Sequence, residues 1–240
     1  DLGPCTDTRR PQVRRLIGFD YRPPLRYQPP RLQRLAHRMA GLRIPQTPLV
    51  SLRLVQVILQ QMISFRDACS GWRALVRRFG TPVPGQSDLW FPPTPESLRR
   101  IASYQFVECG VLPQHGRRIV EAMRHSSRLE AAWDSGEAID AADKTCALLR
   151  GIRGMGPWTI GHLRGNGLGD ADAEVLGDYG HPKQVGYFFD GEPCGDDAQM
   201  LRLLEPYRPH RFYVLTLLVK GSPGPPRRGP RRGRLRDRLR

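Results

Sequence analysis

Lysine is scarce in this 240-residue chain. All but three of its 38 lysine and arginine residues are arginines, and 23 acidic residues leave a formal net charge of +15. A charge of this size indicates what the protein binds rather than how it folds. Polyanions are the first candidates for a binding partner, and nucleic acid is the foremost of them. The planar arginine side chain grips phosphate with two hydrogen bonds, although a GC-rich genome would give the same excess of arginine.

Closely spaced cysteines are missing as well. The five cysteines are odd in number and lie dozens of residues apart, which suits neither a disulfide framework nor a Cys-x-x-Cys metal site. We interpret them as reduced thiols, most simply small buried hydrophobic side chains, of a protein in the bacterial cytoplasm or nucleoid. His162 and His181 have no matching third ligand in the sequence, so we predict no metal site.

A long apolar run is also absent. The longest such stretch, residues 49–65, is interrupted by one arginine and three glutamines, and the sequence does not open with a charged and apolar leader. We therefore expect neither membrane insertion nor export, and we expect a monomer.

Three regions differ in composition. Residues 1–48 are rich in proline and arginine and are predicted to form an arm, whereas residues 49–222 hold the apolar core. Residues 223–240 alternate arginine with glycine and proline and are predicted to be disordered on their own. This tail is either a solvated extension or a non-specific phosphate-binding segment, and the sequence favours neither.

Helical periodicity dominates the core. A helix start is expected at Thr94-Pro95-Glu96, which offers an N-cap, a proline in the first turn and an acid at the positive end of the dipole. Strands have almost no support, so the fold class is predicted to be all-α. The other helices are expected over residues 49–64, 67–79, 114–124, 137–149 and 157–163 and in a pair over 196–219, with a Pro/Gly loop over 81–93 and an acidic loop over 165–182.

A Gly-x-Gly turn separates two of these helical patterns at residues 151–160. Pro157 follows Gly154-Met155-Gly156 at a favoured helix-start position. Backbone N–H groups in such a turn, together with the dipole of the next helix, form an anion site that accepts a DNA phosphate without preference for a base. Taken alone, the turn is more simply a connection between helices.

Acidic residues gather downstream of this turn, in a chain that is otherwise strongly basic. Asp170, Asp172 and Asp178 lie in one glycine-rich loop. A carboxylate that faces DNA is electrostatically costly, which suggests a chemical purpose for one of them. For Asp170 and Asp172 we prefer the simpler interpretation that they cap turns.

The residues of the hairpin and of the loop together resemble a known family. Residues 152–159, Ile-Arg-Gly-Met-Gly-Pro-Trp-Thr, followed by Gly-Asp-Ala-Asp-Ala-Glu-Val-Leu-Gly-Asp-Tyr at 169–179, resemble the helix-hairpin-helix DNA glycosylases, and 3-methyladenine DNA glycosylase II most of all. The likeness extends over residues 32–218. It implies two helical subdomains with a DNA-binding cleft between them.

The resemblance implies a role for individual residues. The family's catalytic aspartate lies a little over twenty residues past the last hairpin glycine, and Asp178 lies 22 residues past Gly156. DNA contacts are implied for the hairpin residues Arg153, Gly154, Met155, Gly156, Trp158 and Thr159, and the pocket for the damaged base is sought among Gln61, Trp72, Phe106 and Tyr179. The sequence departs from close relatives at Val107 and at Gly180-His181-Pro182, so the pocket is expected to differ in shape from theirs.

The implied chemistry is hydrolytic. The enzyme is expected to flip a damaged base, in the first place an N-alkylated purine, out of double-stranded DNA. Asp178 is expected to stabilise the positive charge on the sugar and to orient water, and the product is an abasic site. Trp158 stands where strand-cleaving relatives have a lysine, so a monofunctional enzyme is expected. The cysteines do not match the iron-sulfur cluster of that branch, and the only cofactor allowed for is a monovalent cation between the hairpin and a phosphate.

Other functions remain open from the sequence. The chain could be a non-catalytic helix-hairpin-helix DNA-binding protein, in which Asp178 is only a loop residue. It could be a glycosylase for oxidised or deaminated bases, or an inactive descendant of one. The simplest alternative is a basic nucleoid or RNA-associated protein, which would bind in a salt-dependent way and release no base.

Overall fold

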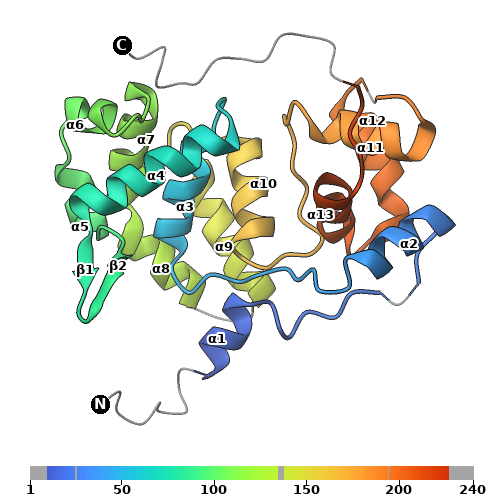
Figure 1. Cartoon of the computed structure of the whole chain (residues 1–240), viewed down its shortest axis with the longest axis horizontal. Helices are drawn as coiled ribbons and strands as arrows, with labels where there is room; N and C mark the ends of the chain where they lie inside the picture. The colour runs from blue at the N-terminus through green and yellow to red at the C-terminus, as the bar shows by residue number, and fades with distance from the viewer. Residues whose placement is uncertain (1–9, 25, 135–137, 194, 227–240) are drawn as a thin grey trace. The chain divides into compact units, whose positions relative to one another are not determined.

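The computed structural model describes residues 10–24, 26–134, 138–193 and 195–226. They form two compact units, which we name by what they contain. The hairpin unit is Leu49–Thr159, and the carboxylate unit joins the residues up to Pro48 to those from Ile160 onward. Helices predominate in both, and the strands in the described residues form one two-stranded sheet (Figure 1). The all-α prediction is confirmed.

A central buried helix organises the hairpin unit. Helix α3 (Val50–Leu59) is apolar on most sides, as its sequence predicts, and it contacts α4, α7 and α8 (Figure 1). Glu130 of α8 accepts hydrogen bonds from the backbone N–H groups of Val50 and Ser51, at 3.0 and 2.9 Å, and so caps α3 from another helix. The remaining helices of this unit are α4 (Phe65–Phe79), α5 (Pro95–Arg100), α6 (Ser103–Glu108), α7 (Pro113–Arg124), α8 (Ser126–Asp134) and α9 (Ala138–Arg150).

The helix start predicted at Thr94 is confirmed. The Thr94 hydroxyl accepts from the backbone N–H of Ser97 at 3.2 Å, and Pro95 occupies the first position of α5. Residues 81–93, in contrast, are not only a loop. They contain the antiparallel strands β1 (Thr81–Val83) and β2 (Gln86–Phe91). Most of their side chains are exposed, so there is no buried alternation from which a strand could be predicted.

The carboxylate unit is likewise built around one buried helix. Helix α13 (Arg211–Gly221) has buried side chains on most sides and contacts α2, α11 and α12. The other elements of this unit are α1 (Arg10–Leu16), α2 (Pro30–Arg38), α11 (His181–Asp190), α12 (Asp197–Leu204) and the short 3-10 helix η2 (Glu205–Tyr207). Helix α10 (Pro157–Asn166) begins at the end of the hairpin unit and continues into this one.

The proline-rich segment predicted as an N-terminal arm adds side chains to this core. Leu32 and Leu35 of α2, and Ile44 after it, are almost fully buried, with at most 3% of each exposed. Apolar side chains spaced along one face of α2 explain why this helix docks while the prolines around it stay extended. Of the predicted basic tail, only residues 223–226 lie within the described part of the chain.

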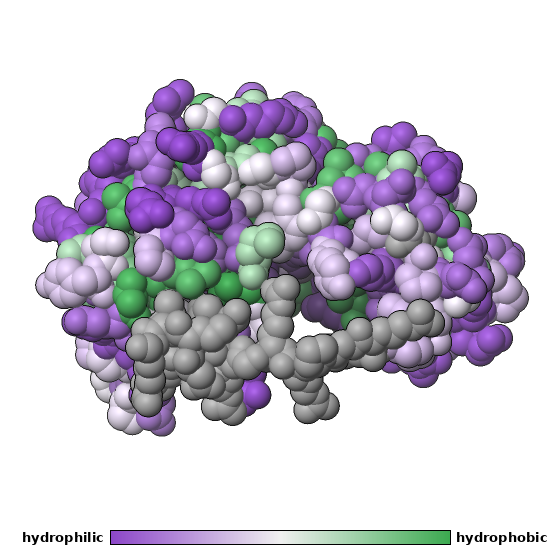
Figure 2. Space-filling view, turned by 90° about the horizontal axis from the view of Figure 1, so that it is seen from above, coloured by the Kyte–Doolittle hydropathy of each residue, from purple (hydrophilic) through white to green (hydrophobic). Residues whose placement is uncertain are grey.

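One face of the molecule can be judged from its colouring by hydropathy. Hydrophilic residues cover most of the face in Figure 2, with apolar residues in smaller patches. No helix in the described ranges is both long enough and apolar enough to cross a membrane.

Candidate functional site

The hairpin turn, residues 151–156, connects the end of α9 to the start of α10. Gly154 and Gly156 are exposed at its tip, and Gly154 has a φ of +89°, which glycine adopts without a steric penalty. Ile152 and Met155 point inward, with 5% and 4% exposed, and fix the turn to the unit. The backbone around the tip is therefore presented to solvent immediately before a helix N-terminus, the arrangement that favours an anion.

The residues predicted to contact DNA differ in what they can offer. Arg153 is exposed, so its guanidinium can reach a phosphate. The side chains of Met155 and Thr159 are buried, with 4% and 2% exposed, which leaves them only backbone groups for an outside partner. Trp158 is half-buried in the first turn of α10.

Gln61, which we sought in the base pocket, supports the hairpin instead. Its amide nitrogen donates to the Gly154 carbonyl at 3.1 Å and to the Thr159 hydroxyl at 2.7 Å, and 7% of the residue is exposed. Its amide oxygen accepts from Arg118 at 2.5 Å. The polar atoms of Gln61 are thus used within the unit, where they hold both sides of the turn.

Arg118 of α7 is a site residue that the sequence did not single out. Its side chain lies over Gly154, where a Cβ atom would come within 2.8–3.0 Å of it. Arg118 brings a positive charge to the turn, beside the exposed Arg150 and Arg153. Only tertiary structure reveals this contact, because 36 residues separate Arg118 from Gly154 and the chain contains many arginines.

The acidic loop, residues 167–180, follows α10 and is tied to Arg211 at the start of α13. Arg211 is 7% exposed in its side chain and donates to both carboxylate oxygens of Asp172, at 2.9 and 2.7 Å, and to Glu174 at 2.5 Å. Burial of Asp172 acts in the opposite direction, but the hydrogen bonds and charge of Arg211 hold the pKa of this carboxyl below its ordinary value. Asp172 is therefore half of a largely buried ion pair rather than only a turn cap.

Asp170 caps a turn, as we preferred from the sequence. Its carboxylate accepts from the backbone N–H of Asp172 at 2.7 Å and also pairs with Arg164 of α10. The loop runs close to the helix at Gly161, where a Cβ atom would meet the Glu174 carbonyl oxygen at 2.2 Å. A glycine at this position lets the backbone of the loop pack directly on α10.

Asp178 lies at the end of this loop, three residues before α11. Its Oδ1 atom accepts hydrogen bonds from the backbone N–H groups of Gly180 and His181, at 2.8 and 2.9 Å. Its Oδ2 atom lies 3.5 Å from Nε2 of His162, and 19% of the side chain is exposed. The carboxylate is therefore oriented by two backbone donors and by the positive end of α11, and one oxygen is directed toward a histidine.

Two histidines flank Asp178. The rings of His162 and His181 have centroids 5.3 Å apart, and Nδ1 of His181 lies 3.9 Å from Oδ1 of Asp178. Burial lowers the pKa of His181 to about 4, despite the nearby carboxylate, so this ring is neutral at pH 7. Contrary to what sequence spacing suggested, the two histidines do have a third possible metal ligand, and it is Asp178.

The other residues sought for a base pocket are divided between the two units. Phe106 is 1% exposed and its ring packs on Gly116. Trp72 is half-buried in α4, and Tyr179 belongs to the other unit, where it is 86% exposed and has Lys183 3.3 Å from the centre of its ring.

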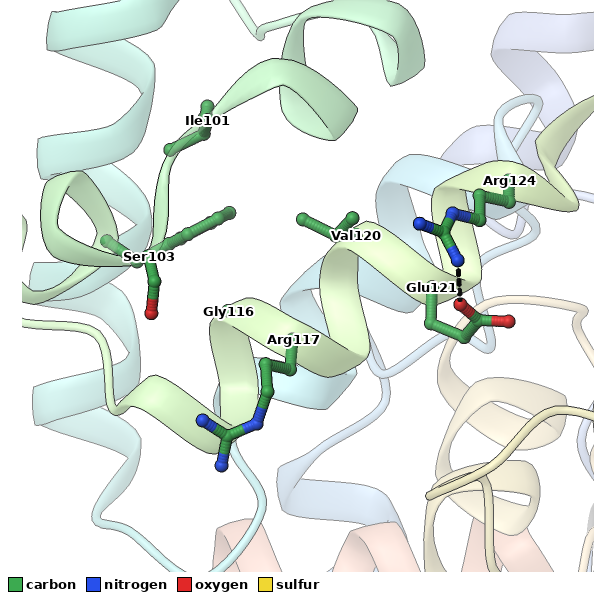
Figure 3. Close-up of a pocket in the computed structure, with 8 residues that line it drawn as sticks. Ile101, Ser103, Gly116, Arg117, Val120, Glu121 and Arg124 are labelled. Atoms are coloured by element: carbon green, nitrogen blue, oxygen red, sulfur yellow. Dashed lines mark hydrogen bonds and ion pairs between the residues drawn. The ribbon is translucent and has the colours of Figure 1, made fainter.

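Phe106 instead lines a hollow of about 230 Å³ on α7. Arg117, Glu121 and Arg124 rim this hollow, and Glu121 and Arg124 form an ion pair at 2.8 Å (Figure 3). It is smaller than most ligand pockets, and its lining does not include a hairpin residue.

Comparison by sequence finds no matching protein-family model and no matching curated protein. Solved structures match in fold. A 3-methyladenine DNA glycosylase from Archaeoglobus fulgidus has a TM-score of 0.66 and 20% identity, with 87% of this chain and 68% of that chain covered. The Schizosaccharomyces pombe 3-methyladenine DNA glycosylase in complex with abasic DNA has a TM-score of 0.64 and 18% identity, with 86% and 93% covered.

A third structure extends the comparison to another substrate class. The 8-oxoguanine glycosylase/lyase of Clostridium acetobutylicum has a TM-score of 0.64 and 12% identity, with 81% of this chain and 67% of that chain covered. Identities this low show the fold alone. The chain accordingly has the fold of the helix-hairpin-helix DNA glycosylases, as the motif at residues 152–179 predicted.

Proposed function

We propose that this protein is a monofunctional DNA glycosylase that removes damaged bases, preferably N-alkylated purines, and leaves an abasic site. The observation that carries the proposal is the setting of Asp178. In a chain with a net charge of +15, this carboxylate is partly exposed, and two backbone N–H groups fix its orientation. The neighbouring structures support this class of enzyme, since they are glycosylases for alkylated or oxidised bases.

The hairpin turn is the proposed grip on the DNA backbone. Its exposed glycines allow a phosphate to approach the N–H groups, and Arg153 adds charge. Contacts of this kind position the enzyme without selecting a sequence, which a repair enzyme requires because damage occurs anywhere. Gln61 contributes by fixing the turn through its hydrogen bonds to the Gly154 carbonyl and the Thr159 hydroxyl.

Asp178 is the proposed catalytic carboxylate. Departure of the base leaves an oxocarbenium-like positive charge on the sugar, and a fixed carboxylate stabilises this charge and can orient the attacking water. Because Oδ1 is occupied by the backbone, Oδ2 is the oxygen proposed to face the sugar. His162, 3.5 Å from Oδ2, is the proposed positioning residue.

Met62 is the proposed wedge that fills the space left by a flipped nucleotide. It follows Gln61 directly, has a φ of +60° and is 87% exposed. It is the one described residue other than glycine with a positive φ, a costly conformation that is kept most often where function requires it. Apolar side chains such as methionine are the kind that insert between base steps.

A cationic alkylated purine fits this arrangement because it is already a good leaving group. Departure of such a base needs no strong general acid, so one carboxylate suffices. Tyr179 is next to Asp178 and 86% exposed, and its ring already attracts the ammonium group of Lys183. A face that attracts one cation can attract another, which makes Tyr179 the proposed contact for the base.

Release of methylated purines from alkylated duplex DNA tests the proposal. We expect wild-type protein to release bases and to leave alkali-labile sites, and Asp178→Asn to lose at least a hundredfold in rate while its duplex affinity is retained. Asp190→Asn, an exposed acid at the end of α11, is the matched control and should behave like wild type. Undiminished release by Asp178→Asn would overturn the assignment, and DNA binding without any release would favour a non-catalytic protein.

Removal of oxidised bases is the second candidate, because the Clostridium acetobutylicum neighbour is an 8-oxoguanine glycosylase/lyase. A lyase requires an amine nucleophile, and Lys183 in the first turn of α11 is the lysine nearest in sequence to Asp178. A duplex with a single 8-oxoguanine distinguishes the candidates. Strand scission, with borohydride trapping that Lys183→Arg abolishes, would favour the second one.

A further inference from the structure

We propose that His162, Asp178 and His181 form a binding site for a divalent transition-metal ion of the zinc class, and that the bound ion switches the carboxylate off. The site itself stands on geometry alone. Its inhibitory effect rests on the proposed function, because it requires Asp178 to take part in base release.

The ligand atoms already lie close together. One ligand atom from each of the three residues lies within 4.8 Å of the others, and Nε2 of His162 is 3.5 Å from Oδ2 of Asp178. Zinc binds nitrogen and oxygen at about 2.0–2.1 Å, which places tetrahedral ligand atoms about 3.3 Å apart. His162 and Asp178 are near this spacing, and His181 needs to move inward only modestly.

An unsatisfied polar atom points to a ligand here. Nδ1 of His181 is buried and has no hydrogen-bond partner in the described part of the chain. Buried polar groups are almost always paired, and an orphan of this kind is commonly explained by a bound water or ion. Asp178 lies 3.9 Å from this nitrogen, beyond hydrogen-bond distance but on the side where an ion would lie.

The surroundings hold two of the ligands in place. The two backbone N–H groups on Oδ1 fix the carboxylate of Asp178. Asn166 lies 3.2 Å from Nδ1 of His162, and with its amide oxygen turned to that nitrogen it accepts the Nδ1 proton, which puts the lone pair of the ring on Nε2, the nitrogen on the side of Asp178. This second contact is typical of histidines that bind metals.

The donor set selects the ion. Two imidazoles and one carboxylate suit zinc and its neighbours in the transition series, whereas magnesium and calcium prefer oxygen ligands. Three protein ligands also leave the fourth tetrahedral position to water.

A bound dication reverses the electrostatics that base release requires. It occupies Asp178 and places net positive charge where the sugar becomes positive, so the transition state loses its stabilisation. DNA binding through the hairpin does not involve these three residues. Zinc is therefore expected to inhibit the rate of base release more than the affinity for DNA, and a chelator should restore the rate.

Metal binding itself is tested without reference to catalysis, on the full-length, untagged chain. Titration with Co²⁺ should give the visible absorption of a four-coordinate site, and calorimetry with Zn²⁺ should give one ion per chain. His162→Gln, Asp178→Asn and His181→Gln should each weaken zinc binding about tenfold or more. His37→Gln, an exposed histidine of α2, is the control and should bind as wild type does. Circular dichroism checks that each variant is folded. If the variant of the buried His181 does not fold, Asp178→Asn still tests the site.

Activity with and without metal completes the test. Zn²⁺ should slow base release at least tenfold, EDTA should reverse this, and duplex affinity should stay within twofold. The site would be overturned if the wild-type protein did not bind zinc, or if all three variants bound it as tightly as wild type does. Zinc bound at the site without any inhibition would overturn the switch. If wild-type protein releases no base but loses zinc binding in the three variants, the site stands and the proposed function fails.

Discussion

The hairpin turn and the acidic loop are both irregular segments beside α10, but they are held in different ways. Neutral groups fix the turn, with the Gln61 amide bonded to Gly154 and Thr159. Charges fix the loop, with Arg211 bonded to Asp172 and Glu174. Carboxylates beside a turn that accepts an anion would be unfavourable, whereas the carboxylates of an acidic loop are stabilised by a nearby arginine.

This difference suggests why Asp178 stands out from the other acids of the loop. Asp170 and Asp172 are bound to arginines, so their charges stabilise structure. Asp178 is oriented by backbone N–H groups and lies beside two histidines. The carboxylate of Asp178 is thus oriented by the backbone and by imidazoles, and its proposed role rests on this setting.

Breaking the main charge contact of the loop should have the largest effect. Asp172→Ala removes the bidentate partner of the nearly buried Arg211 guanidinium and leaves it only Glu174 and Glu205, which is expected to cost about 1.5–3 kcal/mol. Urea denaturation of wild type and variant measures the difference. Asp20→Ala removes an exposed pair with Arg14 and should cost less than about 1 kcal/mol. Equal losses would show that the buried pair is no more important than a surface one.

Removing the neutral support of the turn should have the next largest effect. Gln61→Ala leaves the Gly154 carbonyl and the Thr159 hydroxyl without this partner, at an expected cost of about 1–3 kcal/mol. It should also weaken binding to undamaged duplex, since the turn loses its support. Gln60→Ala removes only a contact within the same segment, from its amide to the Gln56 carbonyl, and serves as the control in both measurements. If Gln61→Ala is destabilised but binds duplex DNA as wild type does, Gln61 supports the fold and is not needed for DNA binding by the hairpin.

Sequence patterns predicted the parts of this molecule whose signals are local. The start of α5 at Thr94 and the turn at Gly154 were found because a cap and a Gly-x-Gly motif are each encoded within a few residues. The β1–β2 hairpin was missed because its exposed strands lack a buried face. Helix α11 was missed because glycine and proline at its start resemble a loop.

The site divides in the same way. Asp178 could be singled out from the sequence because the number of residues that separate it from Gly156 can be counted along the chain. The other contacts join residues that are far apart in the sequence, so no local pattern encodes them. They are Gln61 with Thr159, Arg118 with Gln61, and His162 with Asp178. Gln61 was consequently assigned to a pocket, although its amide is bonded to the hairpin turn. His162 and His181 were not predicted as metal ligands because the sequence shows no third ligand, whereas the fold brings Asp178 close to both.

Filling the space at the tip of the turn should have a smaller effect. Gly154→Ala forces a positive φ on alanine and pushes its Cβ atom against Arg118, which should cost about 1–2 kcal/mol and weaken duplex binding. Gly41→Ala, where a Cβ atom meets nothing within 4 Å, is the control and should change neither stability nor binding. If Gly154→Ala binds DNA as well as wild type, the approach of a phosphate to this backbone is not required.

The smallest expected effect is on pH dependence, and it compares a buried histidine in each unit. Burial, with the charge of Arg118, lowers the pKa of His115 in the hairpin unit to about 4, and burial lowers the pKa of His181 to about 4 as well. The unfolded chain takes up these protons near pH 6.5, so the stability that the two neutral histidines contribute should fall as the pH drops below 6.5, and this fall should end near pH 4.

Each histidine should contribute about 1 kcal/mol of this loss by pH 5.5. His115→Gln, a polar replacement without a titrating group, should therefore remove about 1 kcal/mol of the fall in unfolding free energy between pH 6.5 and 5.5, while the contributions of His181 and of His210, whose pKa burial also lowers, remain. Thermal or urea denaturation at a series of pH values measures it. An unchanged slope would mean that His115 is already protonated in the folded protein, and would leave His181 and the carboxylate unit as the acid-sensitive region.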